Sequence, residues 1–88
     1  QPSQQELRER YDYDPEGYLI FNYRAKNGQY DKGQRAGVIN YEGYRVQNFN
    51  GRQYKTHRLI YIWHHGSITH QIDHVNGIRD DNRIENLR

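Results

Sequence analysis

A β-hairpin is predicted by the stretch GYRVQNFNGRQYKT, residues 43–56. Its centre is Asn50-Gly51, the dipeptide most typical of a two-residue type I′ turn. The residues on both sides are rich in aromatic and β-branched side chains, which favour a strand. Because this hairpin is the clearest local pattern in the chain, the segments on either side of it are interpreted relative to it.

A helix is predicted directly after the hairpin, over residues 57–65. Thr56 is a suitable N-cap, and Gly66 is a typical residue for the end of a helix. The apolar residues between them recur at the spacing of one helix face. We expect this helix to be the main hydrophobic element, with Leu59 and Trp63 packed on the sheet.

The segment before the hairpin also has a β pattern, from Tyr18 onwards. A short apolar strand, 18–21, follows the turn sequence Asp-Pro-Glu-Gly. Residues 1–10 are polar except for Leu7, and predict either a frayed arm or one short helix capped by Ser3. The expected organisation is an N-terminal arm (1–16), an antiparallel β region (17–56), and a C-terminal part (57–88) that forms one compact domain with the β region.

Composition excludes several classes of protein. The chain has 88 residues, 33% of them hydrophobic, and a mean hydropathy of −1.32. No run approaches the roughly 20 apolar residues of a membrane span. The absence of cysteine excludes a disulfide framework, a thiolate metal site and a thiol nucleophile. We expect a cytoplasmic protein without a membrane partner.

The second half of the chain has a positive net charge, whereas the first half does not. Residues 1–42 have six basic and seven acidic side chains, whereas residues 43–88 have seven basic and four acidic ones and all five histidines. Within this half, Arg45, Arg52, Lys55 and Arg58 fall within fourteen residues. The simpler interpretation is a solvated hairpin face. The second is a surface that contacts DNA phosphates, with salt-sensitive affinity.

The residues that suggest chemistry lie near the C-terminus, in the stretches IDHVNG (72–77) and NRIENL (82–87). The carboxylate of Asp73 is a natural ligand for a hard divalent cation, and the adjacent His74 is a suitable general base. Asn86 follows His74 by twelve residues, where its amide is placed to orient the imidazole.

Two other interpretations of these histidines remain open from the residues alone. Asp73 and His74 are, in the simpler case, a turn-capping carboxylate and a surface imidazole. A zinc site from His65, His70 and His74 is also conceivable, because imidazoles are good zinc ligands, although no cysteine supports it.

These stretches resemble the HNH endonucleases of phages and mobile introns, in the variant whose last His is replaced by Asn. The resemblance rests on His57-Arg58-Leu59, Asp73-His74, Asn76-Gly77 and the residues 82–87, and extends over about residues 17–88. It implies an α+β fold in which a small antiparallel β region and a central helix precede a ββα-metal motif.

The resemblance also implies roles for individual residues. His74 matches the base that activates water, Asp73 a carboxylate ligand of one divalent metal (Mg²⁺ or Mn²⁺), and Asn86 the central Asn that holds the loop and the base. The implied activity is metal-dependent hydrolysis or nicking of double-stranded DNA.

One departure from the family pattern concerns the end of the sequence. In the family a further helix carries the last metal ligand, whereas this sequence stops at Arg88. We therefore expect an incomplete motif and an impaired or inactive nuclease. The alternatives are a DNA-binding module without catalysis, and a structural or inhibitory phage protein on the same fold.

Overall fold

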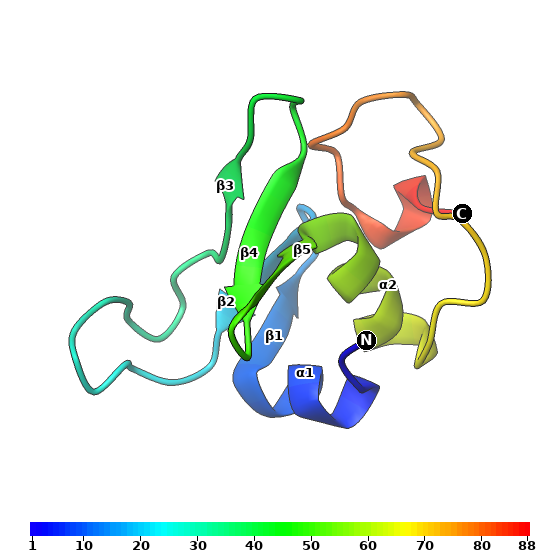
Figure 1. Ribbon diagram of the computed structural model, residues 1–88. Coiled ribbons are helices and arrows are strands. Elements are labelled where there is room, and N and C mark those ends of the chain that lie inside the picture. Colours follow the sequence, from blue (N-terminus) through cyan, green and yellow to red (C-terminus); the bar gives the residue numbers. More distant parts are fainter.

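The computed structural model describes residues 1–88 and has two helices and two small antiparallel sheets, which confirms the α+β class (Figure 1). The elements are α1 (Gln4–Arg10), β1 (Tyr11–Asp14), β2 (Tyr18–Phe21), β3 (Val38–Ile39), β4 (Arg45–Phe49), β5 (Arg52–Lys55), α2 (Thr56–His65) and a short 3-10 helix (Ile84–Asn86). Strands β1 and β2 form one sheet, and β3, β4 and β5 the other. No helix has the length and apolar character that crossing a bilayer requires.

The predicted hairpin is confirmed. Strand β4 pairs with β5 in a register that sets Phe49 opposite Arg52, so that Asn50 and Gly51 form the connection. Both turn residues have positive φ, 50° and 78°, as a type I′ turn requires. The short strand β3 pairs with the outer edge of β4 and completes the second sheet.

Helix α2 follows the hairpin without a break. It begins at Thr56, one residue earlier than predicted, and the prediction that Thr56 is the N-cap is wrong. The cap position belongs to Lys55, and the Thr56 hydroxyl instead donates to Gln47 Oε1 at 2.9 Å. Gly66, at φ 93°, ends the helix as predicted.

The core side of α2 consists of Leu59, Ile60 and Ile62, which are all buried. Trp63 was expected beside them but lies at the margin of the core and is only partly buried. Its indole N–H donates to the carbonyl of Tyr11 at 3.0 Å, and the Arg8 guanidinium covers its ring. The indole therefore fills the boundary between α1 and α2, where its polar edge has a partner.

Residues 1–16 contribute to the core. Ser3 and Glu6 form a reciprocal capping box at the start of α1, which confirms the short-helix interpretation of residues 1–10. Strand β1, for which the sequence analysis had no element, pairs with β2. Leu7 and Tyr11 join the same buried cluster as Leu59, so the N-terminal segment packs against α2 (Figure 1).

Candidate functional site

The C-terminal stretch forms two short antiparallel segments joined by a loop. Asp73 and Arg88 exchange backbone hydrogen bonds of 2.9 and 3.1 Å, and the Val75 amide donates to the carbonyl of Asn86 at 2.8 Å. The two segments place His74 opposite Leu87, which is buried. Residues 76–85 between them form the loop on which the candidate site depends.

Asn86 holds this loop through every group of its side chain. Its Nδ2 donates to the Asp81 carbonyl (2.8 Å) and to Asn76 Oδ1 (3.0 Å), and its Oδ1 accepts from the Asn76 amide (3.0 Å). The residue is only 5% exposed. The amide thus fastens both ends of the turn, but it makes no hydrogen bond to His74, in contrast to the orienting role that its spacing suggested.

A different amide orients His74. The Nε2 of His74 lies 2.8 Å from Oδ1 of Asn82, a residue that is 1% exposed. Because an amide oxygen only accepts hydrogen bonds, this contact requires the hydrogen of the neutral ring to be on Nε2, which leaves Nδ1 with its lone pair. The Nδ2 of Asn82 is buried and has no hydrogen-bond partner in the protein. The contact with His74 is therefore the one side-chain hydrogen bond that Asn82 makes.

The sequence pattern assigned no orienting role to Asn82. The available indication was its place eight residues after His74, in the same stretch as Asn86. Spacing alone did not distinguish the two amides, because Asn82 lies on an irregular loop without a repeating direction, whereas Asn86 ends the 3-10 helix that follows the loop.

Two aromatic rings support the imidazole. His57 and His74 meet at 4.7 Å between ring centroids, and Tyr44 stacks on His57 at 5.7 Å. His57 is buried, and this burial, followed by the nearby His74, lowers its pKa to about 4. His57 is thus neutral at neutral pH, and its ring packs between those of Tyr44 and His74.

Cationic side chains surround the exposed face of this cluster. Lys55 Nζ lies 4.2 Å and the Arg79 guanidinium 4.9 Å from the Tyr44 ring centroid, and Arg79 Nη1 donates to the Glu42 carbonyl. The shallow depression beside His74 has a volume of about 260 Å³. It is lined by Tyr44, Gln71, Ile72, Asp73, His74, Gly77, Arg79 and Arg88. Neither Arg79 nor Tyr44 was among the site residues predicted from the sequence.

Asp73 is the one carboxylate in this depression, and it is exposed. Hard divalent cations take about six or more oxygen ligands, and no three His, Cys, Asp or Glu side chains of the structure are grouped to hold a metal. The residues present therefore do not form a complete metal site. His65 and His70 lie against Tyr61, apart from the His57–His74 pair, so the zinc alternative is not formed either.

The four residues expected to contact DNA have different surroundings. Arg45 is 15% exposed, and its guanidinium donates to Asp80 (3.1 Å) and to the Gly37 carbonyl (2.9 Å). Arg52 lies at the hairpin end, near Glu6, and Arg58 is exposed on the first turn of α2. Of the four, Lys55 joins the Tyr44 cluster.

Comparison with known proteins identifies the segment that carries these groups. Residues 54–88 match the sequence model of a family described as HNH endonuclease. No curated protein and no solved structure matches the chain. The match covers α2, both C-terminal segments and the loop between them. Over residues 54–88 the chain is therefore similar to HNH endonucleases, and this similarity points to a nuclease-type function with a nucleic-acid partner.

Proposed function

We propose that the chain hydrolyses phosphodiester bonds of double-stranded DNA, with His74 as the general base. The observation that carries this proposal is the 2.8 Å contact between His74 Nε2 and Asn82 Oδ1. With its hydrogen on Nε2, the ring accepts a proton from water at Nδ1. The water oxygen forms a bond to phosphorus, the bond from phosphorus to the leaving 3′ oxygen breaks, and that oxygen takes a proton from solvent.

The surroundings of the ring keep it in one orientation. Asn82 fixes the position of Nε2, and Asn86 fixes the loop that carries Asn82. His57 and Tyr44 pack against the ring. A general base acts efficiently when it is held within hydrogen-bond reach of the water, and these four residues restrict its movement.

The cations of the depression are suited to hold the phosphate. Arg79 rests on the Tyr44 ring and uses only Nη1 within the protein, which leaves its other N–H groups for a ligand. Arg88 lines the same depression, and Lys55 lies over the same tyrosine. A guanidinium pairs with phosphate oxygens through two parallel hydrogen bonds, so Arg79 and Arg88 are the proposed phosphate contacts.

The family resemblance implies a divalent ion, Mg²⁺ or Mn²⁺, with Asp73 as a ligand. Asp73 is the one carboxylate beside His74, and one carboxylate is insufficient to hold such an ion. The steps above accordingly use only the protein's own groups, and we expect cleavage by residues 1–88 to be slow.

A nicking assay tests the proposal. Supercoiled plasmid is incubated with the chain and either Mg²⁺ or Mn²⁺, and the conversion to open circles is followed. His74→Ala is expected to lower the nicking rate by about 10²- to 10⁴-fold, the usual contribution of a general base. His70→Ala, which removes an exposed imidazole outside the site, serves as the matched control and is expected to match the parent.

The rival function is a DNA-binding module without catalysis, which the lack of a three-ligand metal cluster favours. Duplex binding in a gel-shift assay together with no nicking by the parent would establish this rival in place of the nuclease. Equal nicking by the parent and His74→Ala would show that another group is the base.

A further inference from the structure

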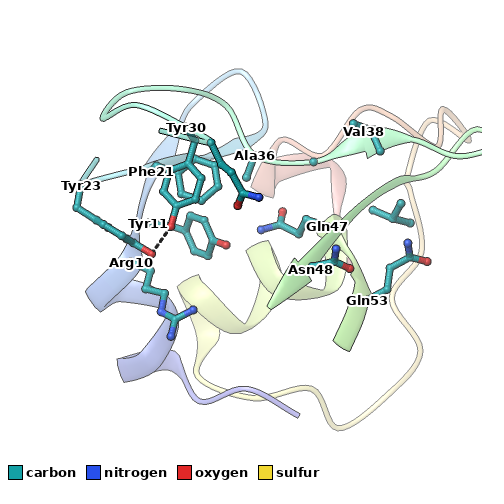
Figure 2. Close-up of a pocket in the computed structure, with 13 residues that line it drawn as sticks. Arg10, Tyr11, Phe21, Tyr23, Tyr30, Ala36, Val38, Gln47, Asn48 and Gln53 are labelled. Carbon is teal, nitrogen blue, oxygen red and sulfur yellow. Dashed lines mark hydrogen bonds between the residues drawn. The ribbon is translucent and has the colours of Figure 1, made fainter. Parts of the chain in front are cut away.

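We propose that a second site, separate from the His74 depression, binds one unpaired nucleobase of a nucleic acid. The site is a pocket of about 360 Å³ between β1, β2, β4 and the segment that follows β2 (Figure 2). This volume lies in the range of about 300–1,000 Å³ that is usual for small-ligand sites. The inference shares with the proposed function the premise that the partner is a nucleic acid.

The first observation concerns a buried hydrogen-bond donor, the side-chain amide of Gln47. Gln47 is 6% exposed, and its Oε1 accepts from the Thr56 hydroxyl, whereas its Nε2 has no well-formed hydrogen bond. Burial raises the pKa of the neighbouring Tyr11 hydroxyl, and the Gln47 amide partly opposes this effect. Figure 2 shows this amide directed across the pocket toward Tyr11. Buried polar groups in folded proteins are almost always paired, so an amide whose only neighbouring acceptor is a weakly bonded hydroxyl at the pocket wall suits a ligand with an acceptor atom.

The second observation is a set of aromatic walls opposite Gln47. Phe21 and Tyr30 are stacked at 3.7 Å between centroids, and Tyr11 lies 5.2 Å from Phe21. The hydroxyl of Tyr30 donates to that of Tyr23 at 2.7 Å, which fixes the orientation of the outer ring. Such rings offer flat apolar surfaces to which an aromatic ligand ring can bind.

The rim of the pocket adds groups that match the edge of a base. Asn48 on β4 and Gln53 on β5 are paired across the hairpin, and both are exposed and line the pocket. Amide side chains both donate and accept hydrogen bonds, as the edges of nucleobases do. Arg10 lies at the same rim and brings a positive charge for the adjoining phosphate.

These features together favour a nucleobase over other ligands. The aromatic walls suit a flat ring, the amide of Gln47 suits an acceptor at the edge of that ring, and Arg10 suits a neighbouring anion. A base inside a duplex presents no free face, so the ligand is an unpaired base of a single strand or of an opened duplex.

The test uses the 88-residue chain and a short single-stranded DNA with one 2-aminopurine, whose fluorescence falls when the base stacks on an aromatic ring. Val38→Trp fills the mouth of the pocket, because Val38 lines it and is 68% exposed. Ile39→Trp is the matched control, since Ile39 is the next residue of β3, is also exposed, and is not a lining residue.

With the parent, we expect saturable quenching of the 2-aminopurine fluorescence. Val38→Trp is expected to bind about ten-fold or more weakly, as for the loss of one base–aromatic stack. Ile39→Trp is expected to bind with the affinity of the parent. Gln47→Glu keeps the acceptor for Thr56, removes the donor, and is expected to weaken binding as well. Thermal melts verify that each variant is folded.

Three results would overturn the inference: no quenching with the parent, binding of the strand without quenching, or equal loss in the two tryptophan variants. Quenching of the probe reports on this pocket, whereas plasmid nicking reports on the His74 depression. A failure of this site is therefore distinguishable from a failure of the proposed nuclease, which is judged by plasmid nicking.

Discussion

The hairpin with α2 (residues 43–65) and the C-terminal segment (residues 70–88) are held together in different ways. The first region consists of regular elements whose backbone hydrogen bonds follow one another, with buried aliphatic residues such as Leu59 and Ile60 beneath them. The second has only one turn of 3-10 helix. Its loop depends on the buried side-chain amides of Asn82 and Asn86.

The difference shows how the candidate site can be precise without being part of a large core. Buried amides with specific hydrogen bonds fix a loop in one geometry, but each bond is individually important. A single substitution in the C-terminal region is therefore expected to disturb the structure of that region alone. A substitution in the core of the first region is expected to lower the stability of the whole fold.

The largest effect on stability is expected from Leu59→Ala, which affects both regions. Leu59 is fully buried in the cluster shared by α1, β2, β4 and α2. The substitution leaves a cavity and is expected to lower the free energy of unfolding by about 2–5 kcal/mol. Urea denaturation measures this loss, and Trp63→Ala, at the margin of the core, is expected to cost less. The reverse order would show that α2 is oriented differently.

The next effect concerns His57, which connects the two regions through its contact with His74. Its pKa of about 4 in the folded chain lies below the usual 6.5, so the unfolded chain binds this proton more readily. Stability is expected to be highest above pH 6.5 and to fall as the pH decreases toward 4, by up to about 3 kcal/mol in the limit.

Urea denaturation at several pH values tests this expectation, with His57→Phe as the comparison. The variant is expected to lose most of the decrease between pH 6.5 and 4. A smaller decrease remains from His64, whose pKa burial also lowers. An unchanged pH profile in His57→Phe would mean that His57 is accessible to protons in the folded chain.

Asn86→Ala is expected to disturb the C-terminal region alone. It removes an amide with three hydrogen bonds and leaves the Asp81 carbonyl without its side-chain donor, at a cost of about 1–3 kcal/mol. Hydrogen exchange is expected to accelerate in residues 73–88 and to remain slow in β4 and β5. The matched control is Asn48→Ala, an exposed amide of the hairpin, with an expected change within about 0.5 kcal/mol. Faster exchange throughout the chain would contradict the separation of the two regions.

The smallest effect is expected from the charges around the depression. Arg79→Ala is expected to reduce the slope of log affinity for duplex DNA against log salt by about one, as for the loss of one phosphate contact. Arg45→Ala is expected to leave this slope nearly unchanged, because Asp80 and Gly37 already bind its guanidinium. Equal slopes for the parent and Arg79→Ala, measured by gel shift over a salt series, would exclude Arg79 from the interface.

The sequence by itself determined the hairpin, α2 and the resemblance of the C-terminal stretch, because each depends on short-range chemistry. Asn50-Gly51 accepts the positive φ of its turn, and the apolar residues of α2 repeat at helical spacing. His74 and Asn86 belong to two short stretches that lie close together in the sequence. None of these requires knowledge of a distant contact.

Only the tertiary structure decided which side chains meet. Nothing in the sequence indicated that β1 pairs with β2 or that Arg45 forms an ion pair with Asp80. The hydrogen bond from the indole of Trp63 to the N-terminal segment was equally unpredictable. Likewise, the partner of His74 is Asn82, because the irregular path of residues 76–85 determines which amide reaches the ring. The physical reason is that a loop has no repeating local geometry that would set the direction of its side chains. These directions, and the contacts between residues distant along the chain, follow from the packing and hydrogen bonding of the whole fold.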